Sequence, residues 1–390
     1  MNTTHNFRQG RFYLLTVDIL KGIAIFPMIF SHSVGWWDQN LSKSYDSLGS
    51  FTIIIIWFTG LMAFPCFLFL YGFNQVNSFL RKKRDNVSPN DIRSHAIKRS
   101  TIFFLFASLA LAIMSIIQAP EKIFNYLLTW HLLHLFAFST LFLLILWELT
   151  SYFEKKLGPS WSFQQVYTIL LLVSFFLVIT LFIFFHDYTV ARENSRLFPV
   201  TLEIQVIFEN VLLDVSSCGL IPWLSFPLAG GITASLFNLP LFSKSNILQK
   251  SKLLLFVNSL FLIIGILFLR VERFISAGLG YASTFPHVFI SIGFIGVIFV
   301  ILILTLDLFQ NIPQKTSFRL FYPIIVVSKI SLTVYLVHPV VAIFNPTFIP
   351  SESVLLLLIS LYSLFFIILA HFWKKWDFKY SFEWIVRKYS

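Results

Sequence analysis

Apolar residues occur along this chain in runs of about twenty, separated by shorter polar segments. A run of about twenty residues is the length that a helix needs to cross the hydrocarbon core of a bilayer. The pattern therefore predicts an all-α polytopic membrane protein with about ten transmembrane helices in a single domain, residues 1–390. The predicted spans are 12–37, 51–80, 100–118, 124–149, 164–186, 218–238, 253–270, 284–306, 321–344 and 353–372.

The polar segments between these spans differ in charge, and the difference predicts an orientation. If the N-terminus is cytoplasmic, most Lys and Arg residues outside the spans fall on the cytoplasmic side, as the positive-inside rule requires. Both termini are then cytoplasmic. Residues 81–99 form a basic cytoplasmic loop, and residues 187–216 form the longest outer loop. That outer segment is either an interfacial lid over a site or a plain surface helix.

Composition supports the membrane class and excludes several kinds of site. Hydrophobic residues make up 57% of the chain, charged residues only 12%, and the mean hydropathy is +0.79. Neither of the two cysteines, Cys66 and Cys218, suggests a disulfide framework. There is no nucleotide-binding glycine loop and no metal-ligand motif. We expect an integral multi-pass protein (of the plasma membrane if prokaryotic), with membrane lipids as partners, no metal and no nucleic acid; a homodimer is left open.

The first span carries three ionisable residues, Asp18, Lys21 and His32, in an otherwise apolar stretch. Ionisable groups at membrane depth are costly and usually have a function or a partner. At about 100° and 1.5 Å per residue, Lys21 and His32 lie within roughly 20° of one another and about 16 Å apart along the helix. Asp18 falls within roughly 40° of His32 by the same geometry. One stripe of this helix therefore combines an acid, a base and an imidazole.

This stretch resembles a known superfamily. The pattern Asp-x-Leu-Lys-Gly-x-Ala from Asp18, followed by Met28 and His32, is similar to the first helix of the membrane acyltransferases. That superfamily includes the acyltransferase-3 family and the heparan-alpha-glucosaminide N-acetyltransferase-like family. The acyltransferase-3 family usually has Arg where this chain has Lys21, and Lys cannot make the two-pronged hydrogen bonds of Arg. The loop 38–50 also lacks the histidine that eukaryotic members of the second family carry after the first helix.

Shorter motifs with similar counterparts in these families follow in the same order along the chain. They are FTGLMAFPCFLFLYGFNQ (58–75), Leu133-His134, GLIPWLSFPLAGG (219–231), SLTVYLVHP (331–339) and YSFEWIVRKY (380–389). The resemblance implies transfer of an acyl group from cytoplasmic acyl-CoA to a hydroxyl or amine of a glycan or lipid-linked sugar, and acetyl-CoA is the expected donor.

The resemblance and the polar stripe together suggest roles for individual residues. His32 is expected to act as the base or as a covalent acyl carrier, unless it only bonds a neighbouring helix. Asp18 and Lys21, three residues apart, either take part in catalysis or neutralise each other. The remaining candidates are His134, His338, Asn74 and Trp130 for the substrate, and Lys98 and Arg99 for the phosphates of acyl-CoA.

Two other functional classes remain open at this point. A transporter or flippase could use the same intramembrane charges to move a solute, a lipid or a lipid-linked sugar. A non-catalytic scaffold would have less use for the aligned polar stripe of the first span. Binding of acyl-CoA separates the acyltransferase from both alternatives.

Overall fold

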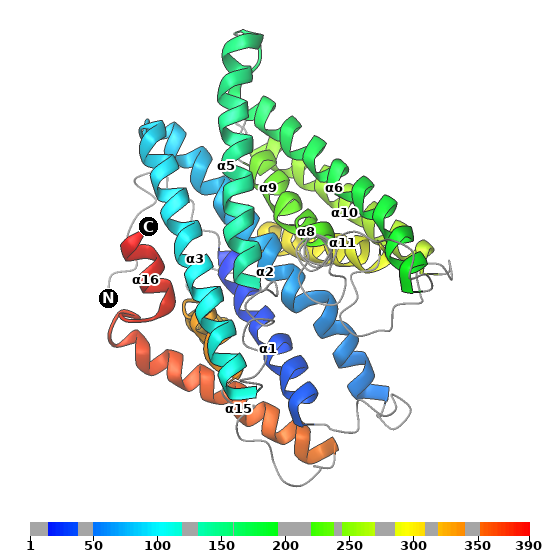
Figure 1. The fold of residues 1–390 in the computed structure, drawn as a ribbon, viewed down its shortest axis with the longest axis vertical. Coiled ribbons are helices and arrows are strands. Elements are labelled where there is room, and N and C mark those ends of the chain that lie inside the picture. Colours follow the sequence, from blue (N-terminus) through cyan, green and yellow to red (C-terminus); the bar gives the residue numbers. More distant parts are fainter. Residues whose placement is uncertain are drawn as a thin grey trace.

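The computed structural model describes residues 15–37, 50–118, 132–158, 160–193, 220–237, 244–269, 285–308, 319–339 and 352–390. Within these ranges the regular structure is entirely helical, without strands (Figure 1). The prediction of an all-α fold is confirmed for this part of the chain.

Seven of the described helices are long and apolar enough to cross a membrane, so the chain is a multi-pass integral membrane protein. They are α3 (Pro89–Gln118), α5 (Leu132–Leu157), α6 (Phe163–Glu193), the pair α8 (Leu220–Trp223) and α9 (Ser225–Phe237), α10 (Lys244–Phe268), α11 (Phe285–Leu302) with the π-helical turn η6 (Ile303–Leu308), and α15 (Glu352–Lys374). The predicted spans 12–37, 51–80 and 321–344 correspond to α1 (Leu15–Trp37), to α2 (Ser50–Arg84) and to the pair α13 (Tyr322–Ser328) and α14 (Ser331–Val337).

Several of these helices expose large apolar side chains on one side, as helices do when they face lipid. Phe104 and Leu105 of α3, Phe184 of α6 and Phe256 of α10 are all more than half exposed. Patches of this kind are unfavourable in water but match a bilayer. The buried core lies between the helices and is rich in aromatic side chains such as Tyr167 and Phe299.

Helix α2 lies centrally in the bundle and packs against α1, α9 and α11 (Figure 1). Its contact with α9 depends on glycine, because a Cβ on Gly72 would lie 1.9 Å from the carbonyl oxygen of Pro227. A Cβ on Gly230 would lie equally close to the carbonyl oxygen of Phe69. Small residues allow membrane helices to approach this closely. The resulting van der Waals contacts hold the helices together in lipid, where the hydrophobic effect does not drive their association.

The structure differs from the predicted boundaries at several points, most clearly in the two segments that were predicted to be loops. Segment 81–99, predicted to be a loop, is helical except for residues 85–88, because α2 continues to Arg84 and α3 begins at Pro89. Ser88 starts α3 by accepting a hydrogen bond from the backbone N–H of Asp91, with Pro89 in the first turn. Of segment 187–216, residues 187–193 extend α6, and the rest lies outside the described residues.

The location of helix breaks also differs from what the sequence suggests. Helix α2 is continuous through Pro65 and Gly72, although these residues favour an interruption. The break occurs instead in the ninth predicted span, where Lys329 and Ile330 separate α13 from α14. After α15 the chain turns through residues 375–380 into a short amphipathic helix, α16 (Phe382–Tyr389), which packs back against α3 and α14.

Candidate functional site

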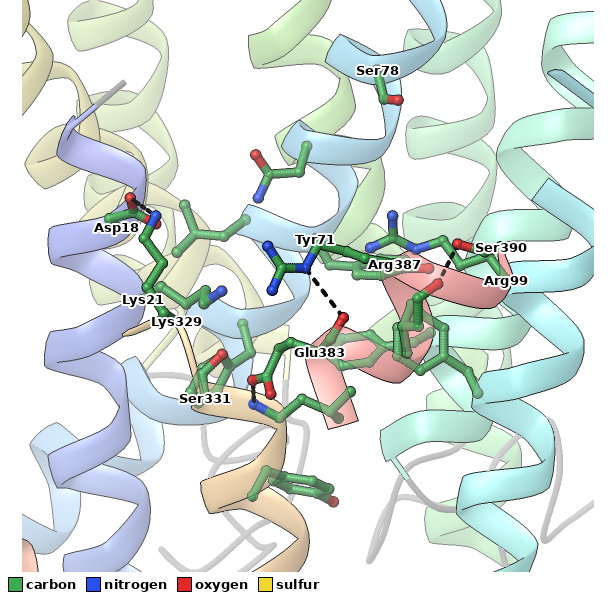
Figure 2. A pocket seen from close by; sticks show the side chains of 18 of the residues that line it. Asp18, Lys21, Tyr71, Ser78, Arg99, Lys329, Ser331, Glu383, Arg387 and Ser390 are labelled. Carbon is green, nitrogen blue, oxygen red and sulfur yellow. Dashed lines mark hydrogen bonds and ion pairs between the residues drawn. The ribbon is translucent and has the colours of Figure 1, made fainter. Parts of the chain in front are cut away.

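A polar cavity of about 510 Å³ opens where α16 meets the bundle (Figure 2). Its wall combines α1, α2, α3, α5, the α13–α14 junction and α16, so six separate segments of the chain form it. It begins beside Arg81 and Lys82, next to the α2–α3 turn, and extends inward to Phe67 and Tyr335. The rim carries exposed side chains, Arg81 and Arg387, so the cavity is open to solvent there.

The charges of this cavity are strongly unbalanced. Its wall contains Lys21, Arg81, Lys82, Arg99, Lys329 and Arg387 against two acidic side chains, Asp18 and Glu383. Within the described residues, the Lys21 side chain makes no hydrogen bond or ion pair. A concave site lined mostly by one sign of charge concentrates ions of the opposite sign. The cavity is therefore suited to a ligand with several negative charges.

Asp18 forms an ion pair at the centre of this cluster, but with Lys329 and not with Lys21. The distance from Lys329 Nζ to Asp18 Oδ2 is 2.5 Å, and the Ser328 hydroxyl donates to the other carboxylate oxygen at 3.3 Å. Asp18 is only 7% exposed. The break between α13 and α14 brings Lys329 to this point.

Glu383 fixes α16 to the bundle through its carboxylate. The carboxylate accepts hydrogen bonds from the backbone N–H groups of Leu332 and Thr333 and from the Thr333 hydroxyl, the last at 2.7 Å. Burial raises the pKa of the Glu383 carboxyl, while the nearby positive charge of Lys21 lowers it. At the other end of α16, the backbone oxygen of Ser390 accepts a hydrogen bond from His95.

Only one of the two basic residues predicted to bind phosphates lines the cavity. The Arg99 guanidinium lies over the rings of Tyr71, at 5.5 Å, and Phe103, at 5.6 Å. Its buried Nε has no hydrogen-bond partner among the described residues. Lys98 is exposed and outside the cavity wall.

His32 and His338 form a hydrogen-bonded pair. The distance from His32 Nδ1 to His338 Nε2 is 2.5 Å, and the two ring planes are nearly parallel, at 18°, with centroids 4.8 Å apart. His338 is only 1% exposed, whereas His32 is partly exposed. The pair joins α1 to the end of α14.

Tyr335 connects this pair with the cavity. It lines the cavity wall, and its ring centroid lies 5.8 Å from that of His338. The inner end of the cavity is thus separated from the histidine pair by the side chain of Tyr335. The cationic cavity and the histidine pair are therefore separate sites that lie next to each other in the bundle.

The other predicted site residues are distributed differently. Asn74 lines the cavity. His134 is 5% exposed and packs its ring against Phe104, with the centroids 4.8 Å apart, and it does not belong to the cavity wall. Trp130 lies outside the described residues. The described residues contain no group of three or more His, Cys, Asp or Glu that could hold a metal ion.

Sequence reasoning did not assign Lys329, Tyr335, Glu383 or Arg387 to the site. The sequence nevertheless contains a feature that singles out each of these residues. Lys329 is a charge inside a predicted span, which indicates a function or a partner. Tyr335 belongs to the SLTVYLVHP motif, and Glu383 and Arg387 belong to the Glu-Trp-x-x-Arg segment of the tail. The motifs were recognised, but nothing in the sequence placed them around one cavity.

No protein-family model matches this chain, and no curated protein matches it in sequence. What the protein does must therefore be inferred from the cavity, its charges and the histidine pair.

Proposed function

We propose that this protein is a membrane acyltransferase that moves an acyl group from acyl-CoA to a hydroxyl or amine of a glycan or lipid-linked sugar. The observation that carries the proposal is the position of the cationic cavity, one side chain away from the hydrogen-bonded histidine pair. The donor has a phosphate-bearing head and a thioester at the end of a long arm. It needs a cationic site for the head and a base near the thioester, and this arrangement offers both.

The residues divide into two groups by position. Arg81, Lys82 and Arg387 line the cavity near the ends of α2 and α16. Arg99 lines it from within α3, with its Nε buried, and these four cations would hold the phosphates. Lys21 lies deeper, on the helix that carries His32 about 16 Å further along its axis. The acyl-bearing arm of the donor would cover that distance and bring the thioester to His32. The acceptor would reach His32 from the opposite end of α1.

The chemistry assigned to His32 is general base catalysis. Its imidazole removes the proton of the acceptor hydroxyl or amine as the acceptor oxygen or nitrogen attacks the thioester carbonyl carbon. The carbon–sulfur bond then breaks, the acyl group stays on the acceptor, and the CoA thiolate takes the proton back from the imidazolium. The products are the acylated acceptor and free CoA, and the enzyme returns to its starting protonation state.

An orientation completes the proposal. Both termini, the α2–α3 turn and the open rim of the cavity would face the cytoplasm, where acyl-CoA is made. The support for this is the excess of Lys and Arg at that end, including Arg81 to Arg84 at the end of α2.

This orientation predicts the labelling of single cysteines in intact cells. A cysteine at Ser88, in the α2–α3 turn, should be protected from an impermeant thiol reagent. Cysteines at Ser47 and Ser351, sequence positions outside the described residues, should react. All three should react after the membrane is permeabilised, which serves as the control. Labelling at Ser88 alone in intact cells would mean that the protein is inserted the other way round.

Donor binding is the direct test of the proposed function. CoA should raise the melting temperature of the purified protein, because a ligand that binds only the folded state stabilises it by about 2.7 kcal/mol at a hundred times its Kd. Arg99→Gln should weaken CoA affinity and reduce this shift at a fixed CoA concentration. Lys98→Gln is the matched control: it removes the same charge one residue away, outside the cavity, and should keep the full shift.

Two results would count against the assignment. A melting temperature that saturating CoA does not change would exclude the cavity as a donor site. Equal shifts in the Arg99→Gln and Lys98→Gln proteins would mean that CoA binds elsewhere.

The break at Lys329 favours one rival, a transporter. Interrupted helices whose charged residues line a cavity are a feature of transporter substrate sites. The same experiment separates the two functions, because a transporter for another solute has no reason to be stabilised by CoA.

A further inference from the structure

We infer that His338 is a positioning residue that sets the tautomer of His32, so that Nδ1 of His32 carries the proton and Nε2 carries the lone pair. This inference rests on the proposed function for its catalytic meaning. The tautomer itself follows from the hydrogen bonds and can be measured without an activity assay.

The reasoning starts at His338 Nδ1. This nitrogen lies 2.7 Å from the carbonyl oxygen of Tyr335 and 3.2 Å from that of Val334. Carbonyl oxygens only accept hydrogen bonds, so Nδ1 of His338 must carry a proton and donate it. In a neutral imidazole with the proton on Nδ1, the other ring nitrogen is an acceptor.

The second step passes from His338 to His32. Nε2 of His338 lies 2.5 Å from Nδ1 of His32, and one of these two nitrogens has to supply the proton between them. Because Nε2 of His338 is the acceptor, Nδ1 of His32 is the donor. A second proton on His338 would reverse this order, but it would place a cation on a side chain that is 1% exposed, which is costly. The basic nitrogen of His32 is therefore Nε2.

His338 is well held for this task. The Tyr362 hydroxyl donates a hydrogen bond to the His338 carbonyl oxygen at 2.8 Å, and the Tyr335 ring lies against the imidazole. With 1% of its surface exposed, His338 has no surface with which to contact an acceptor sugar. It can act on the reaction only through His32.

The arrangement has the logic of a catalytic triad, with a backbone carbonyl and a neutral imidazole in place of a carboxylate. A group that accepts a hydrogen bond from one imidazole nitrogen keeps the proton on that nitrogen, so the other ring nitrogen has the lone pair and acts as the base. When His32 takes the acceptor proton on Nε2, its Nδ1–H still donates to His338 and stabilises the imidazolium. Returning that proton to the CoA thiolate restores the starting tautomer.

The tautomer can be read from solid-state ¹³C–¹⁵N spectra of the protein in lipid bilayers, labelled at its histidines. Subtracting the spectrum of His32→Gln protein identifies the signals of His32 among the nine histidines. At neutral pH we expect a proton on Nδ1 and none on Nε2. The opposite tautomer, or a doubly protonated ring, in the wild-type protein would overturn the inference, and this test does not require any variant of His338 to fold.

Variants of His338 connect the tautomer to catalysis. His338→Leu removes the acceptor, so the His32 tautomers should mix and kcat should fall by about 10²- to 10⁴-fold, the range of a lost or misdirected base. KM for the donor should change little, because the cationic cavity is intact. His338→Gln should restore part of kcat and the Nδ1–H form, since its amide oxygen can accept from His32 while its N–H group donates to the Tyr335 carbonyl.

His371→Leu, at an exposed position on α15, is the control and should leave both readouts unchanged. An unaltered His32 tautomer in folded His338→Leu protein would refute the positioning role, as would unaltered kcat. If no acyl transfer is found while the Nδ1–H form is present in the wild type and lost in His338→Leu, the proposed function fails and the hydrogen-bond inference stands.

Discussion

Replacing His32 by alanine should abolish acyl transfer and leave CoA binding intact. The change removes the base proposed to take the acceptor proton, and loss of a general base costs about 10²- to 10⁴-fold in rate. His32 is not part of the cavity wall, so its replacement leaves the cations of the donor cavity in place. The measurements are the rate of acyl transfer to membrane glycolipids, followed by mass spectrometry, and the melting-temperature shift with CoA.

The two measurements together make the result specific. His371→Ala removes an exposed imidazole from the same protein and should keep full transfer and the full shift. A His32→Ala protein that transfers acyl groups at the wild-type rate would disprove the central assignment. Loss of the CoA shift along with activity would mean that the variant had damaged the fold or the donor site, and His32 would lose its separate role.

The second large effect concerns the Asp18–Lys329 ion pair, and we expect it to be asymmetric. Lys329→Met leaves the Asp18 carboxylate, whose side chain is 10% exposed, without its cation. Breaking a buried pair in this way costs about 3–5 kcal/mol. Asp18→Asn instead removes the carboxylate that pairs with the Lys329 ammonium. Because the Lys329 side chain is 36% exposed, the loss of stability should be smaller. Thermal denaturation in detergent measures both.

Two further variants test the origin of this effect. The double variant Asp18→Asn with Lys329→Met removes both charges and should recover most of the folded yield. Lys21→Met is the matched comparison: it removes an ammonium group from the same cavity, but one without an ion pair among the described residues, so it should cost less stability than Lys329→Met. Equal destabilisation by Lys329→Met and Lys21→Met would show that the pair is not what stabilises this region.

The helical, membrane-spanning nature of the chain was predictable because hydrophobicity over about twenty residues is a strong and local signal. Boundaries were less predictable because hydropathy reports the apolar part of a helix and not its full length. Helix α5 continues through Glu154 and Lys155 to Leu157, and α3 begins at Pro89, since charged residues extend a helix into water at little cost. The break at Lys329 has no local signal, because neither proline nor glycine stands there.

The partners of the site residues were not predictable from spacing along the chain. Asp18 and Lys21 are three residues apart on one helix, yet Asp18 pairs with Lys329, 311 positions away. His32 bonds His338, 306 positions away. One sequence indicates which residues share a helix face, but it does not say which helix that face meets.

Spacing could have separated Lys98 from Arg99. Ile92, Ala96 and Phe103 are buried, and their steps of four and seven residues mark the inward face of α3. Arg99 lies seven residues after Ile92 and four before Phe103, on the same face, whereas Lys98 is about 100° away. The candidate pair was assigned from charge alone, and periodicity distinguishes its members once the inward face is known.

The docking of α16 determines when, during synthesis of the chain, the cavity can form. Helix α16 follows α15 along the chain, yet its Glu383 and Ser390 bond Thr333 and His95, on segments that the ribosome makes earlier. Membrane helices can insert one after another during synthesis, but this wall of the cavity can form only after residue 382 has left the ribosome. A chain arrested just before that point would hold the described helices from α1 to α15 in the bilayer without the α16 wall beside the cations of α2 and α3. The cavity can therefore be completed only after the segment that follows α15 has been synthesised.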